Sequence, residues 1–128
     1  MNLSSVVGIV EALPEIKQVM FGSALLGEDT VVEEFPAVYI APMREVGSEP
    51  IEISNYLQEV DQMFEVVMVC SYAQFSVARE ALVMSLIGKE LIPGSLSACR
   101  FVEGMQVEGT GTLMYWRDIF AIRKQRRA

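Results

Sequence analysis

The segment from Gln58 to Cys70 constrains the fold more than any other part of this sequence, because its residue types alternate with a period of two. Successive side chains of a β-strand point to opposite faces of the sheet. One alternating set is apolar except for a glutamine: Val60, Gln62, Phe64, Val66 and Met68. The other set starts acidic and becomes apolar: Glu59, Asp61, Met63, Glu65, Val67 and Val69. The pattern predicts a long strand whose first half projects beyond the domain and whose second half is buried.

The remaining segments predict two main helices and three further strands. Apolar residues at helical spacing predict a helix over residues 3–12, with an apolar face that continues to Phe21, and a second helix over residues 76–91. Apolar, β-prone runs predict strands over residues 35–40, 97–102 and 112–122, and the glycine-containing segment 103–110 is predicted to be a turn. The order α-β-β-α-β-β predicts an α+β fold with a mainly antiparallel sheet of about four strands and an extended hairpin loop.

The chain is predicted to form one domain over residues 1–128, since 128 residues suit a single hydrophobic core. Residues 43–57 contain a glycine, a proline and several acids without periodicity, which predicts a long, mobile, acidic loop. Residues 123–128 form a basic C-terminal tail. Residues 1–65 hold 12 acids and 2 bases, whereas residues 66–128 hold 5 acids and 8 bases.

The absence of histidine from the sequence removes the commonest general base and the commonest metal ligand. Cys70 and Cys99 are too far apart in sequence for a C-x-x-C redox or zinc motif, and we expect reduced, buried thiols. The glycine pairs at Gly22 and Gly27 and at Gly109 and Gly111 lack the residues that a phosphate-binding loop requires. We therefore expect no catalytic residues, no cofactor and no metal, and hence no enzyme.

The sequence is unusually apolar, with 52% hydrophobic residues and a mean hydropathy of +0.33. Its longest apolar runs are far shorter than the ~18 residues that a membrane span needs. No signal peptide is expected at the N-terminus either. The excess apolar surface is expected to lie in a subunit interface. The second predicted helix is apolar on more than one side, which is typical of a helix between a sheet and a neighbour.

Three interpretations of the basic tail remain open at this stage. A basic tail can bind nucleic acid, can be a solvated terminus, or can meet the acidic loop of another subunit in a head-to-tail contact. Trp116 is either an interface residue or, with Met114 and Phe120 at alternate positions, part of the core. Asp118 could be a buried acid paired with one of three arginines: Arg117 of a neighbour, Arg79 or Arg100.

The order and spacing of several segments resemble the tail terminator, or tail completion, proteins of long-tailed bacteriophages and prophages. These segments are Ala12–Val19, Phe35–Pro42, Phe64–Val69, Leu86–Gly88 and Gly111–Phe120, and the resemblance covers nearly the full length. It implies an α+β subunit that forms a hexameric ring on the head-proximal end of the tail tube in the virion, after assembly in the host bacterial cytoplasm. The ring stops polymerisation of the tail tube protein and offers a docking surface to the head-completion or neck protein. DNA passes through the pore without specific binding, and neither catalysis nor a membrane is involved.

Charge suggests which residues would serve this role. We expect a set of acids to face the pore and repel DNA phosphates: Glu45, Glu49, Glu52, Glu59 and Asp61. We expect the basic tail to dock a partner through Arg123, Lys124, Arg126 and Arg127. Another neck component, such as a head-closure or connector-type protein, is the nearest alternative function. A small ligand-binding α+β module with a cleft beside the 43–57 loop is a more distant one.

Overall fold

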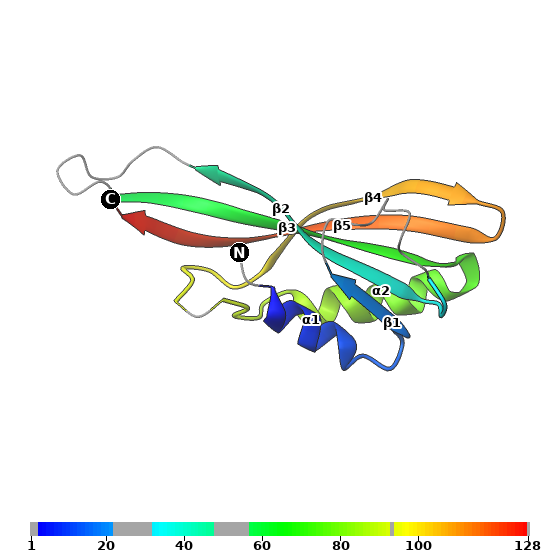
Figure 1. Ribbon diagram of the computed structural model, residues 1–128. Coiled ribbons are helices and arrows are strands. Elements are labelled where there is room, and N and C mark those ends of the chain that lie inside the picture. The colour runs from blue at the N-terminus through cyan, green and yellow to red at the C-terminus, as the bar shows by residue number, and fades with distance from the viewer. Residues whose placement is uncertain (1–2, 22–31, 48–56, 93, 128) are drawn as a thin grey trace.

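The computed structural model describes residues 3–21, 32–92 apart from 48–56, and 94–127. These residues form two helices and five strands in an α+β arrangement (Figure 1), which confirms the predicted fold class. In chain order they are α1 (Ser4–Glu11), β1 (Gln18–Phe21), β2 (Ala37–Gly47), β3 (Leu57–Ser71), α2 (Tyr72–Leu86), β4 (Arg100–Thr110) and β5 (Leu113–Arg127).

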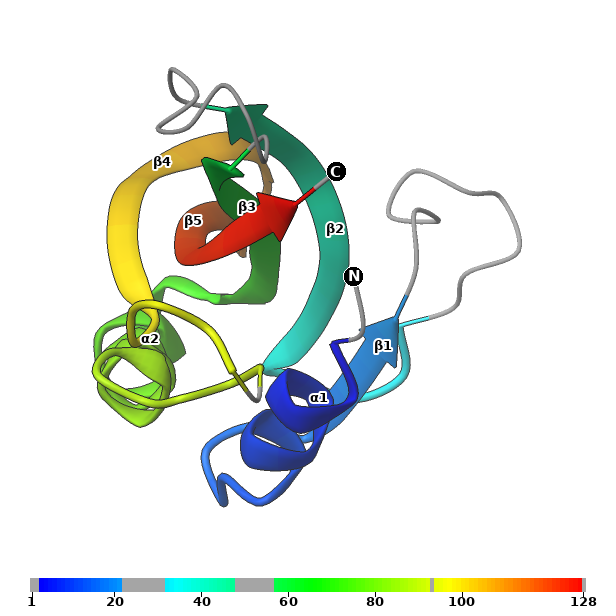
Figure 2. The same cartoon turned by 90° about the vertical axis from the view of Figure 1, so that its left-hand side faces the viewer.

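The five strands form one mainly antiparallel sheet in the order β1-β2-β3-β5-β4. The pairing of β3 with β5 runs from Leu57 opposite Arg127 to Ser71 opposite Leu113, and these two strands form the centre of the sheet. The β2–β3 hairpin is antiparallel as expected. Among the strands that the structure describes, β1 alone pairs in parallel, with the start of β2. The sheet twists and curls strongly, with β2 and β4 on either side of β3 and β5 (Figure 2).

Strand β1 corrects the expectation that the apolar face of the first helix continues to Phe21. Helix α1 ends at Glu11, and Pro14 follows, a residue with no backbone N–H for a helical hydrogen bond. The chain then turns, and the backbone N–H of Lys17 donates to the carbonyl oxygen of Pro36 at 2.8 Å. This bond sets the next residues beside β2. The sheet therefore has five strands instead of about four.

Strand β4 corrects a second expectation, because the predicted turn over residues 103–110 belongs to it. The register of β4 on β5 shifts twice, between Phe101 and Glu103 and between Gln106 and Glu108. Each shift is a β-bulge, which adds a residue and breaks the alternation of side chains. Glycine and lost alternation together make this strand resemble a turn in the sequence.

The predicted acidic loop is shorter in the structure than in the prediction, and most of the predicted basic tail belongs to a strand. Residues 43–47 continue β2, and Leu57 already belongs to β3, so the expected 43–57 loop is too long at both ends. A further bulge between Pro42 and Arg44 conceals the strand periodicity there. Residues 48–56, including Glu49 and Glu52, lie outside the described residues. The basic segment up to Arg127 is strand β5, which pairs with β3 to its end, and is not a free tail.

Helix α2 begins four residues earlier than expected, directly after the last residue of β3. Ser71 caps it: its hydroxyl accepts from the Gln74 backbone N–H, and the Gln74 side chain accepts from the Ser71 backbone N–H. Such a reciprocal capping box satisfies two N–H groups that the first helical turn leaves without partners. The capping box explains why a helix can follow the strand with no loop between them.

Both helices cover one face of the sheet, which we call the helix-covered face; the opposite one is the open face (Figure 1). The core between helices and sheet is apolar. From α1 it receives Leu3, Val6 and Val10, from α2 Ala78, Leu82 and Leu86, and from the central strands Val38, Ile40, Phe64, Val66, Met68, Phe120 and Ile122. The alternating residues of β3 thus divide between the two faces as the sequence predicts.

The far ends of three strands project beyond the helices, at the left of Figure 1. We call this projection the arm, and it comprises residues 42–47 of β2, 57–63 of β3 and 121–127 of β5. In contrast, residues 66–70 of β3 are all buried. The prediction of a strand that projects at its start and is buried at its end is confirmed.

Candidate functional site

The open face of the arm carries a cluster of ion pairs centred on Asp61. Arg123 donates from Nε to Asp61 Oδ1 at 3.1 Å, and Arg100 donates from Nη2 to Asp61 Oδ2 at 3.1 Å. Glu59 accepts from Nη1 of Arg123 at 3.5 Å. Hydrogen bonding from Arg123 is the main reason why the pKa of Asp61 lies below its ordinary value, and the charge of Arg100 lowers it further. The cluster ties the start of β4 to the centre of the arm.

The helix-covered face of the arm holds a second ion pair, between Glu45 of β2 and Arg126 of β5. Their hydrogen bond lowers the pKa of Glu45, and Gln62 and the charge of Lys124 add to this effect. The two partners are on strands that both neighbour β3, so the pair bridges across the central strand. Both faces of the arm are therefore braced by charges from distant parts of the sequence.

The structure thus brings together the two sets of residues that the sequence separated into a pore lining and a docking tail. Glu45, Glu59 and Asp61 pair with Arg123 and Arg126 of the same chain. Lys124 lies on the helix-covered face opposite Val60, and no described carboxylate forms an ion pair with it. Arg127 is the last residue of β5, and its side chain lies outside the described part.

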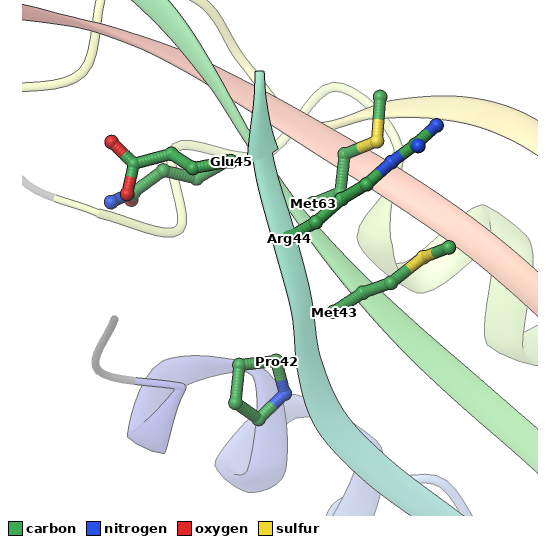
Figure 3. A pocket seen from close by; sticks show the side chains of 6 residues that line it. Pro42, Met43, Arg44, Glu45 and Met63 are labelled. Atoms are coloured by element: carbon green, nitrogen blue, oxygen red, sulfur yellow. The ribbon is translucent and has the colours of Figure 1, made fainter. Parts of the chain in front are cut away.

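A hollow of about 190 Å³ lies beside the β2 bulge (Figure 3). Figure 3 shows Met43 and Arg44 pointing to the same side of β2, while Glu45 points to the other side. Two successive side chains share a side here because the bulge adds one residue to the strand. Since Arg44 lies opposite Met63, this side is the open face. No described carboxylate lies within ion-pair distance of Arg44.

The body of the domain contains a buried ion pair, which resolves the open question about Asp118. Arg79 of α2 donates from Nη2 to Asp118 Oδ1 at 3.0 Å, and Trp116 Nε1 donates to the same oxygen at 3.0 Å. The Arg79 guanidinium lies over the rings of Phe101 and Trp116, 5.5 and 5.4 Å from their centroids. Asp118 is fully buried, and Arg79 is its partner, which holds α2 to strand β5 of the sheet.

Gly104 of β4 makes room for this buried pair. A Cβ atom at this position would lie 2.5 Å from Asp118 Oδ1 and 3.1 Å from Trp116 Nε1. Any larger residue would therefore force the strand or the Asp118 side chain to shift. The sequence analysis did not single out Gly104. The signal is a glycine paired with an aspartate on the neighbouring strand, and it is visible only once the register of β4 on β5 is known.

The described residues contain no group of three or more Cys, Asp or Glu side chains that could hold a metal ion. The two thiols of Cys70 and Cys99 are free and buried, and burial raises both pKa values, that of Cys99 to about 12. No helix in the part of the chain that the structure describes has the length and apolar character needed to cross a membrane.

Together these features define a small α+β fold with a braced, projecting arm. No protein-family model matches the chain, and no curated protein matches it either. A chain in the solved structure of the virion of a native gene transfer agent (GTA) particle has a similar fold, with a TM-score of 0.54. The two are 13% identical in sequence, and the match covers 96% of this chain and 86% of that chain. The fold of this chain therefore resembles that of a component of a virion particle.

Proposed function

We propose that this chain is a structural subunit of a phage-type virion that forms a ring at the head-proximal end of the tail tube. The ring, a hexamer, stops polymerisation of the tail tube protein and receives the neck. The subunit uses no cofactor and catalyses no reaction. The observation that supports this most is the likeness in fold to a virion chain, which extends over 96% of the residues. The order of sequence segments typical of tail terminators supports the particular place in the tail.

The exposed apolar side chains support an assembly of several subunits. They lie on β1, the arm, α2, β4 and the connection before β4. The largest are Phe21, Met43, Val46, Tyr72, Val77, Met84, Leu96, Phe101, Met105 and Val107. A ring with two interfaces for each subunit, and further contacts above and below, can cover exposed apolar side chains on several elements at once.

The ion pairs of the arm suggest how a ring could let DNA pass. Arginines attract phosphates, but Arg100, Arg123 and Arg126 already hold carboxylates. On the arm, Arg123 and Arg126 are thus occupied by carboxylates, whereas Arg44 and Lys124 have no described carboxylate partner. If the arm faces the pore, pairing within the chain performs the role that the sequence analysis gave to unpaired acids.

Deletion of the gene from its phage or prophage, followed by electron microscopy of the tails, tests the proposal. We expect overlong tails of variable length that carry no heads, and restoration of normal length when the wild-type gene is supplied in trans. Normal tails that fail to join heads would assign the protein to the neck instead. Intact virions with tails of normal length would overturn the proposed function altogether.

A further inference from the structure

Helix α2 is apolar on two sides, and the described core uses only one of them. Ala78, Leu82 and Leu86 are buried against the sheet. On the side away from the sheet, Val77 is 68% exposed and Met84 is 57% exposed. Two turns of helix separate these two residues, so they form a stripe along α2. Such a stripe is the expected position of a neighbour.

The outer side of α2 also carries an unpaired charge in the middle of its apolar stripe. An open hollow of about 470 Å³ on this side is lined by Ser76, Val77, Glu80, Ala81 and Met84. Glu80 is exposed, and no described base forms an ion pair with it. A partner that fits this surface therefore needs apolar side chains on both sides of a cation.

The open face of the arm presents that arrangement. Met43 is 38% exposed and Val46 is 43% exposed, and between them lies the unpaired Arg44. The bulge in β2 turns Met43 to the same side as Arg44 (Figure 3), and Val46 shares this side because it lies opposite Asp61. Met43 and Arg44 also line the hollow beside the bulge.

We propose that the arm of one copy docks onto the outer side of α2 of a second copy, with Arg44 against Glu80 and with Met43 and Val46 against the apolar stripe. The occupant is a second copy of this chain because the two surfaces match in charge and in apolar character. They cannot meet within one chain, since one lies on the open face of the sheet and the other on the far side of the helix that covers the opposite face (Figure 1).

A contact between two different surfaces is head-to-tail, and repetition of such a contact closes a ring when the rotation between copies allows it. The inference rests on the proposed function, because it names the contact from which the ring is built. It also gives the arm's unpaired arginine a role in assembly.

Charge reversal tests the contact, with self-association of the purified protein measured by sedimentation velocity. We expect Arg44→Glu alone and Glu80→Arg alone each to raise the dissociation constant about tenfold or more, because each places like charges together. An equimolar mixture of the two variants should associate almost as tightly as wild type. In the mixture each arm finds an α2 of opposite charge.

Charge reversals outside the two surfaces provide matched controls. Lys89→Glu and Glu11→Arg change the same charges at exposed positions that the contact does not include, and they should leave the dissociation constant within about twofold of wild type. Urea unfolding of every variant separates a lost contact from a lost fold. Restoration by mixing is itself evidence against misfolding.

Three results would overturn the inference. They are a wild-type chain that remains monomeric at millimolar concentration, single variants that associate as wild type does, and a mixture no better than its components. The tail-length experiment is independent of these. If gene deletion gives overlong tails but substitution of Arg44 or Glu80 has no effect on association, this contact alone is rejected. If gene deletion leaves tails of normal length, the proposed function is rejected and the association data still stand.

Discussion

The arm and the body of this domain both rely on ion pairs, but they place them in opposite surroundings. In the body, the Asp118 side chain is 1% exposed and shares one oxygen between Arg79 and Trp116. In the arm, Asp61 lies at the surface between Arg100 and Arg123, whose side chains are each almost half exposed. Water and salt screen the arm's pairs more than the body's pair, in which the Arg79 side chain is 28% exposed and the Asp118 side chain is shielded.

The comparison separates two uses of charge. Removal of one partner from a buried pair leaves a charge without water or counter-ion, so a buried pair acts as a lock on the fold. Exposed pairs contribute little stability. They nevertheless align strands, and they occupy arginines and carboxylates that could otherwise bind charged partners. The body's pair therefore fixes α2 on the sheet, whereas the arm's pairs govern what the arm can attract.

Loss of the Asp118 carboxylate should produce the largest effect. We expect Asp118→Ala to lower the free energy of unfolding by about 3 kcal/mol, because Arg79 and Trp116 then lose their shared acceptor. Urea denaturation followed by circular dichroism measures this. Asp61→Ala is the matched control in the arm and should lower stability clearly less. Equal losses for the two variants would contradict the distinction between lock and alignment.

Substitution of Gly104 sharpens the same comparison from the backbone side. The Cβ of Gly104→Ala would meet Asp118 Oδ1 at 2.5 Å, and we expect a loss of about 2 kcal/mol in the free energy of unfolding. Gly8 in α1 is the control, since a Cβ there meets nothing within 4 Å. Gly8→Ala should instead stabilise the protein, by up to about 1 kcal/mol, through helix propensity. Thermal unfolding of both variants would show shifts of opposite sign.

The arm's contribution should depend on pH in a defined direction. The pKa of Asp61 in the folded protein lies below its ordinary value of 3.8, so its ion pairs stabilise the fold at pH values above 3.8. This stabilisation is lost as the pH falls through the lowered pKa. Wild type should exceed Asp61→Asn in stability at pH 7, and the difference should vanish in strong acid. A stability difference between wild type and Asp61→Asn that grows as the pH falls would contradict this prediction.

The smallest effect concerns the two buried thiols, which report on opening of the body. Burial raises the pKa of Cys99 to about 12, so hardly any thiolate forms at pH 8, and Cys70 is equally inaccessible. We expect an aromatic disulfide reagent to label neither thiol in the folded protein and both in urea. Asp118→Ala should accelerate labelling, whereas Asp61→Asn should not. Rapid labelling of native wild type would contradict the burial of both.

Sequence patterns predicted the parts of the fold in which alternation is unbroken. Strand β3 is the best example, with its projecting start, its buried end and the division of residues between two faces. The pattern failed where a bulge inserts a residue, as in β4 and at Met43 of β2. It also failed for β1, whose four residues are too few to show a period.

The candidate site could also be predicted only in part from the sequence. Charge counting assigned Glu45 and Asp61 to a pore lining and Arg123 and Arg126 to a separate docking tail, whereas the structure pairs these acids with these bases. Their pairing could not be predicted, because Glu45 and Arg126 are 81 positions apart and meet only through the register of two strands on β3. Arg79 and Asp118 are 39 positions apart, and sequence reasoning left three arginines open.

The direct junction between β3 and α2 has a mechanical consequence. Ser71 ends the strand and Tyr72 begins the helix, with the capping box closing the joint. The arm and α2 are thus connected through β3 without an intervening loop, so a movement of the arm would be transmitted directly to the helix. In a ring where each arm contacts α2 of the next subunit, as we propose, a tilt of one subunit would therefore be transmitted to all the others.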